Sequence, residues 1–112
     1  MSMNYPQLAQ AEWHPFTETY VYSVPQAPGV YWLGIASSLT RPITATIIYI
    51  GQSNNLQRRL LEHIRKADPC LSQANVFAYA LHDHPEVRER QLLDDYARKN
   101  GGRLPRCNDR RG

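Results

Sequence analysis

Five polar side chains between residues 31 and 89 have the chemistry to bind ions or to move protons: Tyr31, Tyr49, Arg59, His63 and Glu89. A guanidinium offers a planar fork of donors that fits phosphate oxygens. A carboxylate binds divalent cations, and imidazole and phenol groups transfer protons. Each group also has a purely structural explanation, because tyrosine pairs often only pack and a carboxylate can simply pair with an arginine. The elements that carry these residues therefore decide whether they meet.

The two tyrosines lie in segments that are rich in strand-forming residues, 29–35 and 44–50. A polar loop with Pro42 separates the segments, so we expect an antiparallel hairpin. Side-chain alternation predicts that Tyr31 faces Tyr49, which would place the two phenols side by side at the open end of the hairpin. The same register pairs Leu33 with Ile47, Ile35 with Ala45, Val30 with Ile50 and Trp32 with Ile48.

The arginine and the histidine belong to a predicted helix from about Leu56 to Lys66, which follows a turn with helix-capping residues. Its apolar positions recur every four residues and form one stripe. Arg59 and His63 are also four residues apart, so they are neighbours along one edge of that stripe.

The carboxylate belongs to a second predicted helix, which follows a third strand over residues 75–81. Asp83 as N-cap with Glu86 three residues later fits a capping box, and Gly101 ends the helix. Its expected core face is Val87, Leu92, Leu93 and Tyr96. Glu89 then lies on or beside the buried face, where a carboxylate is costly unless an arginine or a cation compensates it. Both explanations stay open at this point.

Composition limits the class of protein. The 112 residues suffice for a single small domain, and the longest apolar run, residues 47–50, is too short to cross a bilayer. Two cysteines, Cys70 and Cys107, make no disulfide framework, so we expect a reducing, cytoplasmic location. His82 and His84 are better explained by a turn and a helix cap than by metal ligation.

The net charge of +3 is unevenly distributed. Residues 1–51 carry −1 and residues 52–112 carry +4, and eleven of the thirteen cationic side chains are arginines. This skew indicates either a solvated basic surface or a polyanionic partner such as nucleic acid.

The order and spacing of these residues resemble the GIY-YIG nuclease family over about residues 28–108. The first signature is Gly29-Val30-Tyr31, with valine in place of isoleucine, and the second is intact as Tyr49-Ile50-Gly51. An arginine eight residues past that glycine, a histidine one turn later, a glutamate before two aliphatic residues and a closing Pro-x-x-Asn complete the resemblance: Arg59, His63, Glu89 and Pro105 to Asn108.

The resemblance implies an α/β (α+β) domain in which helices flank a small three-stranded antiparallel sheet. It implies a metal-dependent endonuclease that hydrolyses phosphodiester bonds in DNA. Tyr31 would act as general base and Arg59 would contact the scissile phosphate. Tyr49 would either hydrogen-bond near Tyr31 or position the phosphate, and His63 would either assist proton movement or hold Tyr31. Glu89 would hold Mg²⁺ or Mn²⁺. The supporting or substrate-binding positions would be Gly51, Gln52 and Asn108.

Two departures from the family pattern stand out. The loop between the two signatures is enlarged, and Gln52 stands where many members have lysine. We expect residues 1–24 to be an irregular lead-in that packs on the domain, and residues 25–112 to form the nuclease-like domain with a basic tail. We expect no separate sequence-reading module, so the protein would read DNA structure, work as an oligomer such as a homodimer, or depend on a protein partner for specificity.

Two other functions compete with this interpretation. The first is a nucleic-acid-binding module that keeps the fold but does not cut. The second is a small redox or metal protein that uses Cys70, Cys107, His82 and His84. Retention of both tyrosines, Arg59 and Glu89 favours the nuclease over the binder.

Overall fold

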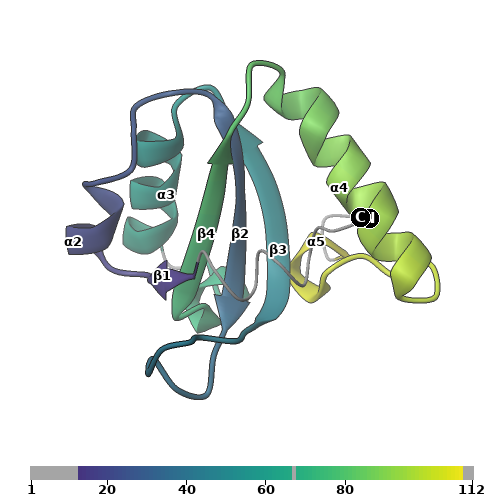
Figure 1. The fold of residues 1–112 in the computed structure, drawn as a ribbon, viewed down its shortest axis with the longest axis horizontal. Coiled ribbons are helices and arrows are strands. Elements are labelled where there is room, and N and C mark those ends of the chain that lie inside the picture. The colour runs from purple at the N-terminus through teal and green to yellow at the C-terminus, as the bar shows by residue number, and fades with distance from the viewer. Residues whose placement is uncertain (1–12, 67, 110–112) are drawn as a thin grey trace.

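Four antiparallel strands form one sheet in the order β1-β4-β2-β3, with helices on both faces (Figure 1). The computed structural model describes residues 13–66 and 68–109. The strands are β1 (His14–Pro15), β2 (Gly29–Ile35), β3 (Thr46–Ser53) and β4 (Val76–Leu81). The expected class, an antiparallel sheet flanked by helices, is confirmed. The expected number of strands is wrong, because two residues ahead of the hairpin add β1 to the free edge of β4.

The helices are α2 (Glu18–Val21), α3 (Leu56–Arg65), the 3₁₀ turn η1 (Leu71–Gln73), α4 (Pro85–Lys99) and α5 (Arg106–Asp109). Helices α3 and α4 lie on opposite sides of the sheet in Figure 1. The core accordingly has two clusters. The α3 side contains Tyr31, Leu33, Tyr49, Leu60 and Phe77, and the α4 side contains Trp13, Val30, Trp32, Ile50 and Leu92. None of the helices within the described ranges is long and apolar enough to cross a membrane.

The register of the central hairpin differs from the expected one by two residues. Tyr31 pairs with Gly51, and Tyr49 pairs with Leu33. Strand β3 continues to Ser53, past the predicted end, and an irregularity between Leu33 and Gly34 shifts the pairing beyond it. A slip of two residues keeps every side chain on its face, whereas a slip of one would reverse it. Both phenols therefore still face α3.

The lead-in segment is more regular than predicted. Within this segment, Glu18–Val21 form α2, whose N-cap Thr17 accepts a hydrogen bond from the backbone of Tyr20. Trp13 is buried against the α4 face of the sheet. Residues 1–12 of the predicted lead-in, together with Arg110 and Arg111 of the tail, lie outside the described part of the chain.

Helix α4 begins later than the capping-box interpretation predicts. Its N-cap is His84, whose side chain makes no capping bond, and Pro85 occupies the first turn. The predicted Asp83–Glu86 box is wrong, because proline at this position starts the helix without needing a partner for a backbone N–H. Val87 is 47% exposed and does not belong to the core, whereas Leu92 is buried.

Cys70 and Cys107 form a disulfide, with 5.8 Å between their Cα atoms. The expectation of two reduced thiols therefore does not hold in this structure. The bond joins the residue before η1 to α5, two segments that are separated by strand β4 and helix α4 in the sequence.

Candidate active site

Tyr31 is the centre of the candidate site and is only 1% exposed. Its ring lies directly over Gly51, its partner on β3. A Cβ atom at residue 51 would lie 2.5 Å from both Cζ and the hydroxyl oxygen of Tyr31, which is closer than real contacts allow. The second signature therefore needs glycine because a side chain would displace the phenol.

Three aromatic rings meet at this point. The hydroxyl of Tyr31 and Nε2 of His63 are 2.7 Å apart. The ring of Tyr49 is centred 6.1 Å from that of Tyr31 and 5.8 Å from that of His63. Helix α3 brings His63 to this position because Asn55 caps its start, accepting a hydrogen bond from the backbone of Arg58 at 3.1 Å.

Electrostatics keep both members of the Tyr31–His63 pair neutral at pH 7. Burial raises the pKa of Tyr31, and the neighbouring Tyr49 adds to this, whereas Arg59 opposes it. Burial, helped by the positive charge of Arg59, lowers the pKa of His63 to about 4. A neutral imidazole leaves Nε2 free to accept a proton, so the Tyr31 hydroxyl donates and Nε2 accepts.

Arg59 lies between the phenol and a carboxylate. Its guanidinium is close enough to Tyr31 to lower the pKa of that hydroxyl. Its Nη1 atom also donates to Oε1 of Glu62 at 2.9 Å, and this bond holds the pKa of Glu62 below its usual range. The arginine side chain is 38% exposed, so it can be reached from solvent. Sequence analysis missed Glu62, although its spacing of three residues from Arg59 was a usable signal.

Glu89 lies on α4, which packs along β3. The residue is half-buried, and its negative charge makes a minor contribution to raising the pKa of Tyr31. The charge of a carboxylate on one side of the sheet thus acts on a hydroxyl on the other. Within the described ranges no three histidine, cysteine, aspartate or glutamate side chains gather in a group that could hold a metal ion.

The predicted supporting residues lie in different places. Gln52 is half-buried and pairs with Val30, so it belongs to the α4 face rather than to the Tyr31 face. Asn108, on α5, is buried and brackets Ile50: its Oδ1 accepts from the backbone N–H at 2.9 Å and its Nδ2 donates to the carbonyl at 3.0 Å. Since Ile50 lies between Tyr49 and Gly51, Asn108 fixes the backbone beneath the site.

The remaining candidates form no common centre. Nδ1 of His82 accepts a hydrogen bond from the backbone of His84 at 3.0 Å, which agrees with a role in the turn before α4. Cys70 and Cys107 are bonded to each other.

No model of a known protein family matches the sequence, and no curated protein matches it. Among solved structures, the chain is similar to the GIY-YIG N-terminal endonuclease domain of UvrC from Thermotoga maritima, a point mutant bound to its catalytic divalent cation. The TM-score is 0.48 and the sequence identity is 20%, over 72% of this chain and 84% of that chain. Values this low do not transfer the activity of that domain to this chain.

Proposed function

We propose that this protein is a metal-dependent endonuclease that hydrolyses phosphodiester bonds in DNA. The observation that carries the proposal is the convergence on the Tyr31 hydroxyl. His63 bonds it, Arg59 lies beside it, and the charge of Glu89 reaches it. These groups come from three elements far apart in the sequence, and packing alone does not require an arginine and a carboxylate beside a buried phenol.

The pair of Tyr31 and His63 can take a proton from an attacking water. A phenol whose pKa is raised is a poor base by itself. However, the hydrogen bond to Nε2 of His63 draws the Tyr31 proton away from the phenolic oxygen, which raises the electron density with which that oxygen can accept a proton from water. The positive charge of Arg59 stabilises the negative oxygen that forms. Tyr31 would then be the group that takes the proton of the attacking water, and His63 is its hydrogen-bond acceptor.

Arg59 is the group that would contact the scissile phosphate. It is half exposed, and its hydrogen bond to Glu62 holds the side chain on the site's side of α3. A guanidinium that meets a phosphate here offsets the charge that builds up as the fifth oxygen adds to phosphorus. The basic skew of residues 52–112 provides further attraction for the polyanion.

Glu89 would hold the divalent cation. Its donor chemistry fits, because a half-buried carboxylate is a hard oxygen ligand and Mg²⁺ or Mn²⁺ takes its other ligands from water and phosphate. When bound, the cation polarises a phosphate oxygen and neutralises developing charge. Glu89 itself fixes where that charge lies relative to Tyr31.

The test is cleavage of supercoiled plasmid and of labelled oligonucleotides with Mg²⁺, with Mn²⁺ and with a chelator. We expect cation-dependent nicking by the native protein and a loss of roughly 100-fold or more in Glu89→Gln. Glu86→Gln is the matched control, since Glu86 is exposed one turn earlier on the same helix. DNA affinity, measured by anisotropy in the chelator, checks that the variants still bind.

Two results would contradict the proposal. Equal nicking by Glu89→Gln and the native protein would remove Glu89 from the reaction. DNA binding without cation-dependent cleavage of duplex, single-stranded, nicked or branched substrates would instead support the non-cleaving binding module.

A further inference from the structure

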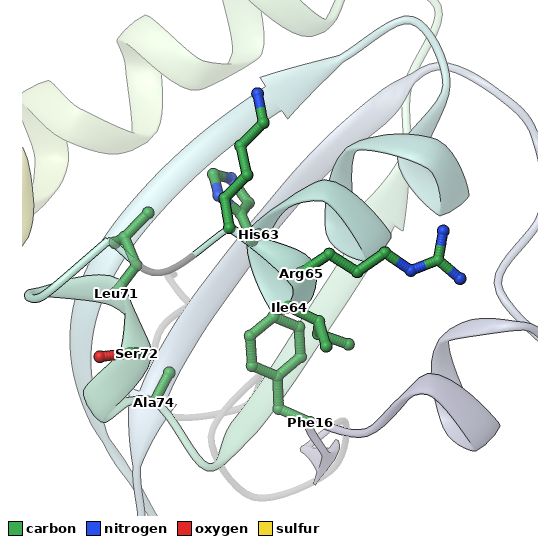
Figure 2. A pocket seen from close by; sticks show the side chains of 8 residues that line it. Phe16, His63, Ile64, Arg65, Leu71, Ser72 and Ala74 are labelled. Atoms are coloured by element: carbon green, nitrogen blue, oxygen red, sulfur yellow. The ribbon is translucent and has the colours of Figure 1, made fainter.

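A cavity of about 290 Å³ opens beside the candidate site, at the C-terminal end of α3 (Figure 2). Three segments build it: the residue after β1, the last turn of α3, and the region of η1. Its lining is Phe16, His63, Ile64, Arg65, Lys66, Leu71, Ser72 and Ala74. Only His63 among these residues takes part in the mechanism described above.

The walls combine an apolar floor with a polar rim. Phe16, Ile64 and Ala74 are partly buried and pack against the α3-side core. The rim carries the exposed side chains of Lys66 and Ser72. Such a surface fits a ligand that has a flat, apolar part and an anionic group next to it.

The two cations at the rim differ. Arg65 donates to Oε2 of Glu18 at 2.9 Å and to the hydroxyl of Tyr22 at 2.9 Å, so its charge is offset and its direction is fixed. Figure 2 shows the Arg65 side chain extending away from the end of α3. The Lys66 charge is near enough to affect His63. Of the two cations at the rim, Lys66 is therefore the one whose charge acts on His63.

The cavity is continuous with the candidate site through one side chain. His63 lines the cavity and also bonds the Tyr31 hydroxyl at 2.7 Å. His63 is therefore a wall that the cavity shares with the candidate site, so a strand bound at the site would pass beside the cavity.

We propose that this cavity receives one unstacked nucleobase of the bound strand, next to the cleaved phosphate, with Phe16 as the apolar surface and Lys66 on the flanking phosphate. This inference rests on the proposed function and names its substrate class. Its volume of about 290 Å³ is just below the usual range for ligand pockets, which suits one base better than a base pair. Since unstacking costs least where a base is already unpaired, the preferred DNA has an unpaired nucleotide at the cleavage position.

The test measures binding in a chelator, so that the DNA stays intact. Two probes are compared: a duplex with one unpaired thymidine, and the same duplex with an abasic residue at that position. We expect the native protein to bind the first roughly tenfold more tightly, the effect typical of one stacked base. In Ser72→Trp, where the new side chain fills the exposed rim, this difference should disappear.

Ser37→Trp is the matched control, because Ser37 is exposed in the loop between β2 and β3 and does not line the cavity. It should keep the tenfold preference. Lys66→Ala should weaken the binding of both probes. It should also reduce the slope of log affinity against log salt concentration by about one, as expected for one lost phosphate contact. Circular dichroism and melting curves confirm that each variant is folded.

The outcomes separate this inference from the proposed function. If the native protein cuts DNA but binds the two probes equally, or if Ser72→Trp keeps the preference, the cavity holds no base and the inference is wrong. If no DNA is cut yet the preference is present and lost only in Ser72→Trp, the base site stands and the nuclease proposal fails.

Discussion

The hydroxyl of Tyr31 and Nε2 of His63 lie 2.7 Å apart, although the residues are 32 positions apart in the chain. Burial lowers the pKa of His63 to about 4 from an ordinary value of 6.5. The unfolded chain therefore binds a proton at a higher pH than the folded chain does. The free energy of unfolding should be greatest above pH 6.5 and should fall as the pH drops towards 4, by about 2 kcal/mol after allowance for solvent screening.

Urea denaturation at several pH values between 7 and 4.5 measures this effect. His63→Gln is the control, because its amide still accepts from Tyr31 but does not titrate. The variant should show a flatter pH dependence than the native protein over that window. Parallel curves for the two proteins would show that His63 is not buried as described.

Gly51→Ala should abolish activity while leaving every reactive side chain in the sequence. The new Cβ would lie 2.5 Å from the Tyr31 ring, so the phenol must move away from His63. Overpacking of this kind costs about 1–3 kcal/mol of stability. Nicking assays and denaturation check both effects. Activity within twofold of the native value would mean that the position of the phenol is unimportant.

Asn108→Asp tests the bracket on Ile50. The aspartate can accept from the Ile50 N–H but cannot donate to its carbonyl, which loses a buried hydrogen bond and faces a carboxylate. We expect a loss of about 2–4 kcal/mol in the free energy of unfolding. Asn54→Asp, the same change at an exposed turn position, should cost little. Equal losses in both variants would contradict the structural role of Asn108.

Reduction of the Cys70–Cys107 disulfide should destabilise the protein. The bond closes a loop with a sequence separation of 37 residues, for which chain entropy accounts for roughly 3–4 kcal/mol. Urea denaturation with and without a phosphine reductant measures the change. The double variant with serine at both positions should not respond to the reductant. A native protein that is equally stable in both conditions would show that the bond does not form in solution.

Glu62→Gln should strengthen DNA binding. Glu62 pairs with Arg59 at 2.9 Å and with Arg58 at 3.8 Å. Its neutralisation releases the Arg59 guanidinium from an ion pair and removes one negative charge that repels DNA. We expect an affinity gain of a few fold at low salt, since such exposed pairs are weak. Asp95→Asn removes the same charge from an ion-paired position on α4 and should have a smaller effect. An equal gain in DNA affinity in both variants would mean that only the net charge matters, and not the pairing of Glu62 with Arg59.

The sequence was sufficient to locate the elements that carry the site. Strand β2 has the predicted bounds, and α3 differs from the predicted helix by one residue, because capping and apolar spacing are local signals. The register of β2 against β3 was wrong because alternation is unchanged by a slip of two residues. Strand β1 was missed because a two-residue strand leaves no periodic signal.

The side-chain environment was less accessible to sequence analysis. The disulfide joins segments whose proximity depends on the whole fold, so spacing does not reveal it. Burial raises the pKa of the Tyr31 hydroxyl, and the opposing charge of Arg59 does not reverse this. Burial of this kind depends on the packing of three elements, which no local pattern encodes.

Strand β3 lies at the edge of the sheet, where backbone groups normally point outward without a partner strand. The amide of Asn108 occupies both the N–H and the carbonyl of Ile50 at this edge. It thus imitates a residue of a fifth strand. A second polypeptide that tried to extend the sheet would have to displace α5 first, so the asparagine protects the chain from edge-to-edge aggregation.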